Sequence, residues 1–455
     1  MKSLRERLLD GQADAASLEV YSDAQGVENT DAYQALRSRV HRKLLDQLNL
    51  NAMENMAPEA LQHELKIATT RILDQDKLPI NEAERGRLIR DIQYEVLGLG
   101  PLESLMADAT VSDILVNTYR HVYVERQGKL EHTDVRFENE AHLLKIIDKI
   151  VSAIGRRIDE SSPMVDARLP DGSRVNAIIP PLAVDGAILS IRRFAVTPLR
   201  MQDFLQRKSL TAGMATILEG LVAAKLNVLI SGGTGTGTGK TTLLNVLSNY
   251  IPENERIITI EDAAELQLQQ PHVVRLETRP ANIEGKGEVT QRMLVRNSLR
   301  MRPDRIIVGE VRGSEVADML QAMNTGHEGS IATVHANTPR DALTRLENMM
   351  AMAGFNLPPK VMREQISAAL RVVVHISRLS DGQRKITSIN EISGMEGDII
   401  TMQDIFVFQQ TGLAKDGTVQ GHFKATGVTP LFLERLHTRG VEVSDELFDP
   451  ARWYE

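Results

Sequence analysis

The chain has 455 residues, 42% of them hydrophobic and 25% charged, and its formal net charge is −8 at pH 7. This length exceeds what one hydrophobic core usually serves, so it indicates two or three domains of an ordinary folded protein. The negative charge gives no overall attraction to nucleic acid, and the absence of cysteine excludes disulfides, thiolate zinc sites and cysteine nucleophiles.

The first part of the chain is predicted to be helical. Residues 1–30 are polar and weakly periodic, so we expect a flexible N-terminus with at most a short helix at residues 4–9. They also lack the apolar core of a signal peptide. Apolar residues then recur at helical spacing in residues 33–48, 58–75 and 81–99. They predict a helical bundle over residues 31–100, with a docking surface for another protein as the alternative interpretation.

Short strands follow and predict an α+β domain over residues 101–197. Alternating apolar residues mark strands within residues 113–137, 166–181 and 186–194, and residues 141–155 have a helical pattern. Asp171-Gly172 is a favourable hairpin turn. The stretch AVTPLRMQ, residues 195–202, is interpreted as a linker.

Residues 205–455 are predicted to form an α/β domain with a C-terminal extension. Buried strands are expected at LNVLIS, RIITI, HVVRL, RIIVGE and SIATVH, with helical stretches between them. This alternation predicts a mainly parallel sheet covered on both faces, whose ligands bind at the carboxyl ends of the strands. No apolar run approaches the roughly 20 residues needed to span a bilayer, so we expect a cytoplasmic protein.

The stretch SGGTGTGTGKTT, residues 231–242, lies between the first of these strands and a predicted helix. The usual phosphate-loop spacing, G-x-x-x-x-G-K-[ST], requires glycine where this chain has Thr234, so the pattern is not met. The order strand, glycines, helix nevertheless favours a phosphate loop over a flexible surface loop. We therefore predict ATP and Mg²⁺ as cofactors. The expected binding residues are Gly235, Gly237, Thr238, Gly239, Lys240, Thr241 and Thr242, with Lys240 on the phosphates and Thr241 on the metal.

Carboxylates end two of the predicted strands. Glu261, Asp262 and Glu265 follow RIITI, and Glu310 follows RIIVG. ATP hydrolysis needs a carboxylate beside the metal and the attacking water, and we assign Glu310 to water activation and, with Thr241, to the metal. Taken alone, each would be an ordinary carboxylate at the end of a strand.

Two histidines and several arginines complete the candidate set. His327 and His335 lie at opposite ends of one predicted strand, which is not the spacing of a metal-binding pair. His335 is expected to contact the γ-phosphate or to relay its presence to neighbouring groups. For both histidines, a capping or hydrogen-bonding role is the alternative. Arginines gather in three places, at Arg168 and Arg174, at Arg192 and Arg193, and at Arg300, Arg302, Arg305 and Arg312. Those before residue 197 are predicted to bring positive charge to the transferring phosphate.

These motifs resemble the secretion and pilus-assembly ATPases, RecA-like hexameric motors of type II secretion, type IV pili and type IV secretion. The resemblance runs from about residue 33 to the early 400s and rests on segments such as GLGPLESLMADATVSDILVN, RIITIEDAAELQL and RIIVGEVRGSEVADMLQAMNTGHEGSIATVHANTP. Within this group the chain most resembles the CpaF/TadA-type ATPase of tight-adherence (Flp, type IVc) pili.

The resemblance implies a role for each candidate. Gly239, Lys240 and Thr241 match the end of the Walker A motif, and Glu310 matches the Walker B glutamate. Glu261 and Glu265 match the acidic "Asp box", and His327 and His335 match the "His box". Arg168, Arg174, Arg192 and Arg193 lie in segments whose arginines reach the nucleotide in this family.

The resemblance also implies the setting. It points to a cytoplasmic homo-hexamer at the inner face of the cytoplasmic membrane, attached through inner-membrane pilus platform proteins and binding no nucleic acid. Its expected function is to power pilus assembly, with retraction as a further role. The alternatives are a type IV secretion traffic ATPase, a nucleotide-binding assembly module that does not hydrolyse ATP, and a DNA motor, which DNA-stimulated activity would distinguish.

The chain departs from the family at its glycine loop. Family loops read G-G-T-G-x-G-K-T-T, whereas this chain carries one additional Thr-Gly pair. We expect residues 237–242 to keep their register because the following helix fixes them, and the surplus pair to bulge within residues 232–235. A displaced donor would slow hydrolysis, since a phosphate site tolerates errors of only about 0.5 Å.

Overall fold

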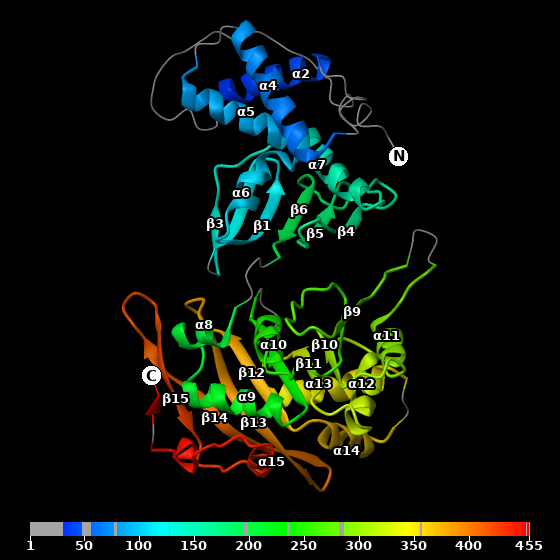
Figure 1. The fold of residues 1–455 in the computed structure, drawn as a ribbon, viewed down its shortest axis with the longest axis vertical. Coiled ribbons are helices and arrows are strands. Elements are labelled where there is room, and N and C mark those ends of the chain that lie inside the picture. Colours follow the sequence, from blue (N-terminus) through cyan, green and yellow to red (C-terminus); the bar gives the residue numbers. More distant parts are fainter. Residues whose placement is uncertain are drawn as a thin grey trace. The chain divides into compact units, whose positions relative to one another are not determined.

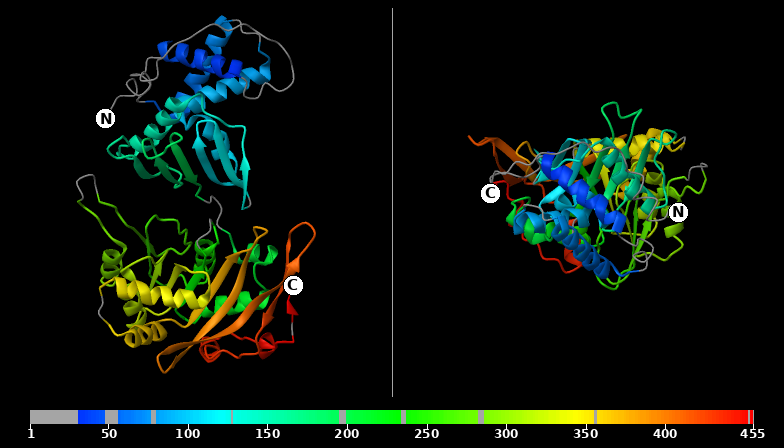
Figure 2. Two further views of the ribbon diagram at one scale, coloured as in Figure 1. Left: turned by 180° about the vertical axis from the view of Figure 1, so that it is seen from behind. Right: turned by 90° about the horizontal axis from the view of Figure 1, so that it is seen from above.

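The protein is described by a computed structural model (Figures 1 and 2). It divides into two compact units, Met1–Ala195 and Val196–Glu455. The described residues are 31–47, 56–76, 80–126, 128–194, 199–233, 237–281, 286–354, 357–451 and 453–454. The expected flexible segment 1–30, with its short helix at 4–9, lies outside this set. None of the described helices is long and apolar enough to cross a membrane.

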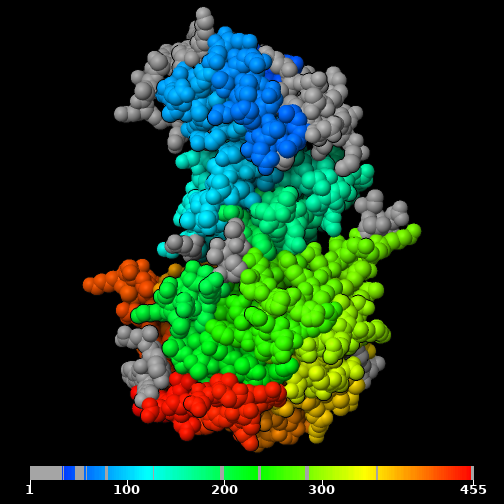
Figure 3. Space-filling view, viewed as in Figure 1, coloured from blue at the N-terminus to red at the C-terminus, as the bar shows by residue number. Residues whose placement is uncertain are grey.

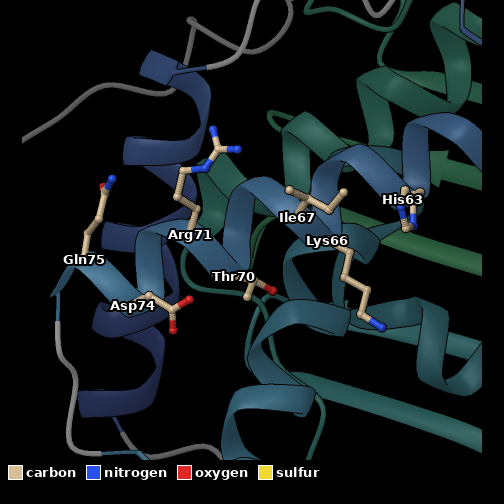
Figure 4. Close-up of a pocket in the computed structure, with 7 residues that line it drawn as sticks. All are labelled: His63, Lys66, Ile67, Thr70, Arg71, Asp74 and Gln75. Carbon is tan, nitrogen blue, oxygen red and sulfur yellow. The ribbon is translucent and has the colours of Figure 1, made fainter.

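The first unit begins with three helices at the positions that the apolar periodicity predicts. They are α2 (Asp31–Gln47), α4 (Pro58–Asp76) and α5 (Glu82–Leu97). α5 starts at a capping box, in which Asn81 and Glu84 each accept the other's backbone N–H. The helices bury a shared apolar cluster that includes Val40, Leu44, Leu65, Ile72, Leu88 and Ile92. A shallow hollow of about 570 Å³ lies along α4 between His63 and Gln75 (Figure 4).

An antiparallel sheet follows in the same unit. After the short helices η1 (Gly100–Leu102) and α6 (Glu103–Ala107), its order is β3-β2-β1-β6-β5-β4. The strands are β1 (Val111–Thr118), β2 (His121–Arg126), β3 (Lys129–His132), β4 (Met164–Arg168), β5 (Arg174–Ile178) and β6 (Ile188–Arg192). Helix α7 (Glu140–Ala153) packs its apolar side on one face of this sheet. The β4–β5 hairpin turns at the predicted Asp171-Gly172, where Gly172 has a φ of 90°.

The second unit is built on a ten-stranded sheet of order β16-β15-β14-β13-β12-β7-β11-β10-β8-β9. Its parallel strands are β7 (Val228–Gly232), β8 (Ile257–Glu261), β9 (Val273–Glu277), β10 (Arg305–Val308), β11 (Ile331–His335) and β12 (Val372–Arg378). Five of them lie at the predicted segments. The antiparallel strands β13 (Arg384–Glu396), β14 (Ile399–Leu413), β15 (Val419–Ala425) and β16 (Trp453–Tyr454) extend the sheet beyond what the sequence predicts.

Helices cover both faces of this sheet. One face packs against α9 (Ala212–Ala223), α10 (Lys240–Ser248) and α15 (Leu433–Thr438). The other packs against α11 (Gln291–Ser298), α12 (Glu315–Asn324), α13 (Pro339–Met352) and α14 (Pro359–Ala369). Figure 1 shows the first group in front of the sheet and Figure 2 shows the second, while the C-terminal residues (red in Figure 3) form one border of this unit.

Two short helices complete the second unit. They are α8 (Met201–Gln206) and η2 (Asp445–Phe448). The expected linker over residues 195–202 is therefore too long. α8 begins at Met201. The Asp203 carboxylate caps it by accepting the backbone N–H of Arg200.

Candidate functional site

The glycine-rich loop leaves β7 and leads directly into α10, in the order that the sequence predicts. α10 begins at Lys240, and the residue that caps it, Gly239, has a φ of 97°. Gly237 is also left-handed, with a φ of 69°. Glycine takes this conformation without strain, and it lets successive N–H groups turn toward one side. Inward-turned N–H groups beside the positive end of a helix are the arrangement by which proteins bind anions.

The amino-terminal half of the loop is only partly described. Gly232 still belongs to β7 and pairs with His335 of β11. A Cβ on Gly232 would lie 2.6 Å from the backbone oxygen of Ile376, so this position requires glycine. The surplus Thr-Gly pair therefore does not bulge at Gly232. Residues 234–236, with the candidate Gly235, lie outside the described set, so the position of the bulge stays a prediction.

Lys240 is buried at the base of the loop. Its Nζ lies 3.2 Å from the hydroxyl of the buried Thr238 and 3.5 Å from the carbonyl oxygens of Gly232 and Gly233. Burial lowers the pKa of Lys240 to about 8, while the negative charge of Glu310 acts in the opposite direction. Lys240 thus has its ammonium aimed into the loop. The other candidates of this helix, Thr241 and Thr242, occupy its first turn and are half-buried.

His335 connects Lys240 to Glu310. An ammonium only donates hydrogen bonds, so Nδ1 of His335 accepts from Lys240 at 3.1 Å, and its Nε2–H donates to Oε1 of Glu310 at 2.9 Å. Burial, and then the charge of Lys240, lower the pKa of His335. The ring is therefore neutral at pH 7, as its acceptor role at Nδ1 requires.

Glu310 follows β10 and lies in a charged network at the carboxyl edge of the sheet. Arg312 approaches both oxygens of this carboxylate, with Nε and Nη2 each 2.9 Å away, and its Nη1 lies 3.2 Å from Oδ2 of Asp262. Burial acts to raise the pKa of Glu310, but the hydrogen bond and charge of Arg312 outweigh it and hold the pKa below its usual value. Glu310 is consequently an ionised carboxylate whose two oxygens already have partners.

The other acidic candidates lie at the end of β8. Glu261 is buried, and its Oε1 accepts the backbone N–H groups of Glu265 and Leu266 at 2.9 and 3.0 Å. Its Oε2 is buried without a hydrogen-bond partner among the described residues. Burial raises the pKa of Glu261 to about 7. Glu261 thus shapes the loop after β8, while the half-buried Glu265 follows in that loop.

His327 does not join this cluster. It lies beyond the end of α12, before β11 begins, and its backbone N–H donates to the carbonyl of Ala322 at 3.3 Å. His335 is at the other end of β11, next to Lys240. The structure therefore brings one of the two candidate histidines to the loop, and His327 has the helix-capping contact that the alternative interpretation described.

The candidate arginines of the first unit form a row across its sheet. Arg168, Arg174 and Arg192 are register partners on the neighbouring strands β4, β5 and β6. Arg192 also pairs with Asp113 of β1, with Nε and Oδ1 3.1 Å apart. Arg193 differs, because its guanidinium donates to the carbonyls of Asp108 and Val111. The contact of these four arginines with nucleotide stays a prediction.

Sequence reasoning missed two contacts at this site. It did not assign the bidentate pairing of Arg312 with Glu310, although their spacing of two residues after a strand was visible. It also missed Arg384, whose Nε–H donates to the backbone carbonyl of Gly237. No sequence signal joins residues 147 positions apart, since only the sheet brings them together.

Comparison with known proteins identifies the family. Residues 95–429 match the family described as "Type II/IV secretion system protein". The chain belongs to this family. Among relatives of this type II/IV secretion protein, a putative conjugal transfer protein of Mycobacterium tuberculosis is 39% identical over 317 residues, which is 68% of this chain and 89% of the relative. The conjugal transfer protein TrbB of Rhizobium radiobacter is 34% identical over 317 residues, 68% of this chain and 91% of TrbB.

A solved structure is similar as well. The VirB11 ATPase from the Brucella suis type IV secretion system, in complex with sulphate, shares 29% sequence identity over 64% of this chain and 95% of that chain, with a TM-score of 0.34. The names of the two sequence relatives refer to conjugal transfer. A special closeness to the tight-adherence pilus ATPases therefore stays a prediction.

Proposed function

We propose that this type II/IV secretion protein is an ATP-hydrolysing motor subunit. The observation that carries the proposal is the continuous path from Lys240 through His335 to Glu310 at the mouth of the glycine loop. In this arrangement the phosphates bind at the N-terminus of α10, and Lys240 neutralises their charge. Lys240, His335 and Glu310 then lie together at the carboxyl edge of the sheet, where ligands of such sheets bind.

The residues present fit a nucleotide with Mg²⁺. Magnesium prefers oxygen ligands and usually takes one or two protein oxygens together with phosphate oxygens and waters. The Thr241 hydroxyl and the Glu310 carboxylate would supply the protein oxygens. The described residues hold no group of three His, Cys, Asp or Glu side chains that could bind a metal ion. When bound, Mg²⁺ would neutralise charge that develops on the phosphates.

Glu310 is assigned to orienting the attacking water. Phosphoryl transfer depends more on orienting the nucleophile and stabilising charge than on a strong base. An ionised carboxylate of low pKa can therefore orient the water. Arg312 must release one oxygen of Glu310 for that role, while the neutral His335 keeps its hydrogen bond and fixes the carboxylate. The approach of a negatively charged γ-phosphate gives Arg312 a competing partner.

The assembly is proposed from the resemblance rather than from contacts. We infer a cytoplasmic homo-hexamer at the inner face of the membrane, attached through integral-membrane platform proteins. In such a ring, the row of Arg168, Arg174 and Arg192, together with Arg193, would bring positive charge to the nucleotide.

A type IV secretion system and a Tad pilus system are the two candidate machines in which this chain acts. The named conjugal transfer and type IV secretion relatives support a traffic ATPase of a type IV secretion system more than a Tad pilus motor. A strain lacking this chain separates them. Loss of substrate or plasmid transfer with normal surface pili supports the first, and loss of pili with normal transfer supports the second.

ATP turnover by the purified chain tests the enzyme assignment. Lys240→Ala and Glu310→Ala should each reduce turnover at least 100-fold, a typical cost of losing a transition-state contact, whereas Arg363→Ala, on α14, should leave it unchanged. A form lacking one Thr-Gly pair tests the surplus. Turnover only in that shorter form would support the module that binds ATP without hydrolysing it, and turnover insensitive to Lys240→Ala would reject the site.

A further inference from the structure

Arg384 reaches the glycine loop from outside the parallel part of the sheet. It is the first residue of β13, where it pairs in register with Arg378 of β12. Its Nε–H donates to the backbone carbonyl of Gly237, the first described residue of the carboxyl half of the loop. An antiparallel strand that contributes nothing to the nucleotide motifs thus makes a charged hydrogen bond to the loop that carries them.

The loop glycines make room for this approach. A Cβ on Gly237 would lie 2.8 Å from Nη2 of Arg384. A Cβ on Gly239 would lie 3.4 Å from Cδ of Arg384 and 3.2 Å from Cδ1 of Ile376. Gly237 and Gly239 therefore serve two purposes, since they take left-handed φ angles and also let β12 and β13 pack closely against the loop.

The hydrogen bond determines which way the next N–H points. A trans peptide is planar, and its C=O and N–H groups point in opposite directions. Because Arg384 holds the C=O of Gly237 toward β13, the N–H of Thr238 points away from β13. Thr238 is buried, and its hydroxyl contacts Nζ of Lys240 at 3.2 Å. Arg384 thus constrains the N–H of a residue whose side chain contacts Lys240.

The base of Arg384 is itself held in place. In the turn before it, the N–H of Leu379 donates to the carbonyl of Gln383 at 2.7 Å. The carboxylate of Asp381 accepts the N–H of Gln383 at 2.9 Å and, through its other oxygen, the N–H of Val419 of β15 at 2.8 Å. The turn that carries Arg384 is thus hydrogen-bonded to a strand two positions farther along the sheet.

We propose that Arg384 is a positioning residue for nucleotide binding, which orients the Gly237–Thr238 peptide so that the Thr238 N–H donates to a phosphate oxygen. This proposal rests on the proposed function. It also gives the antiparallel strands a role at the site, because their hydrogen bonds fix the carboxyl half of the loop whatever the length of the segment upstream.

Nucleotide affinity and turnover of the full chain test this role. We compare Arg384→Ala and Arg384→Lys with Arg363→Ala, a matched control that also loses a guanidinium donating to a backbone carbonyl, that of Asp398 at 3.0 Å. The probes are a fluorescent ATP analogue for Kd and ATP itself for kcat and KM. Arg384→Ala should raise Kd and KM about tenfold, the usual scale for losing a charged hydrogen bond. The value of kcat should change less than threefold. Arg384→Lys should recover part of the loss, because an ammonium also donates to a carbonyl.

Two results would overturn the proposal. One is an Arg384→Ala chain whose Kd and KM match those of Arg363→Ala. The other is a loss of kcat at unchanged KM, which would place Arg384 in the chemical step. Where Arg384→Ala does not fold, Arg384→Gln, which keeps a donor, replaces it in the same comparison. Failure of the proposed function is distinguishable, since it would appear as turnover insensitive to Lys240→Ala, whereas Kd for the analogue still reports on Arg384.

Discussion

Glu261 should make the second unit lose stability as pH rises. Burial raises the pKa of this carboxyl from 4.5 to about 7, against the opposing hydrogen bonds from Glu265 and Leu266. The folded state therefore binds the proton more tightly than the unfolded state. The stability that this proton provides is complete below pH 4.5 and is lost as pH rises through 7. For a side chain only 3% exposed, these two pKa values correspond to a loss of about 2.5 kcal/mol between pH 5 and pH 8.

Replacing Glu261 by glutamine should remove this dependence. Glutamine keeps the carbonyl oxygen that accepts the two N–H groups but cannot ionise. Urea unfolding at pH 5 and pH 8 measures the effect, followed by the fluorescence of the only tryptophan, Trp453, which belongs to β16 of the second unit. Glu277→Gln is the matched control, because Glu277 is the register partner of Glu261 on β9 and is exposed.

The comparison between the variants isolates Glu261 from the other titrating groups. The loss of unfolding free energy from pH 5 to pH 8 should be about 2.5 kcal/mol smaller in Glu261→Gln than in the natural chain, and unchanged in Glu277→Gln. Equal losses in the natural chain and Glu261→Gln would refute the reasoning, since they would mean that the carboxylate is hydrated or paired when it ionises.

Three further predictions concern charged groups. Arg305→Ala should lower the unfolding free energy measured in urea by about 3 to 5 kcal/mol. The reason is that Arg305 is fully buried and its Nε lies 2.6 Å from Oε2 of Glu255. A loss below about 1 kcal/mol, the scale of an exposed ion pair, would contradict this. Arg312→Ala should raise the pKa of Glu310 and move the acid limb of the pH profile of kcat/KM to higher pH. An unmoved limb would show that the ionisation of Glu310 does not determine it. Amine labelling followed by mass spectrometry should give Lys240 a pKa near 8, and a lower one in Glu310→Gln because the charge of Glu310 raises it; an unchanged value would show that the two groups do not interact.

The strands β7, β8 and β10 could be read from the sequence because they are buried on both faces. β7 and β8 are fully buried, so each gives an uninterrupted apolar run. β14 is fully buried only at Ile400, Ile405 and Phe406, and polar residues on both sides limit its longest apolar run to residues 405–408 of its fifteen. The extent of the sheet was therefore not predictable from apolar runs alone.

The site was predictable in its residues but not in its connections. Lys240, Glu310 and His335 were assigned from their places after strands and before a helix. The hydrogen bond between Lys240 and His335 joins residues 95 positions apart, and it depends on the adjacency of β7 and β11. The lowered pKa of Lys240 arises from burial in the folded loop, which no local pattern encodes. His327 matched the same family motif as His335. It lies before the start of β11, however, whereas His335 lies at the carboxyl end of β11 beside Lys240.

The antiparallel strands also cover a sheet edge that could otherwise pair with a strand of another chain. A sheet that ended at β12 would expose a row of unpaired N–H and C=O groups beside the glycine loop, a surface on which another chain could add a strand. β13, β14 and β15 move that open edge away from the loop, and β16 pairs with Phe423 and Lys424 of β15. The opposite edge, β9, is five residues long and exposes Arg275 and Glu277. The border at β9 of the described sheet thus carries exposed charges, which disfavour the addition of a strand from another chain.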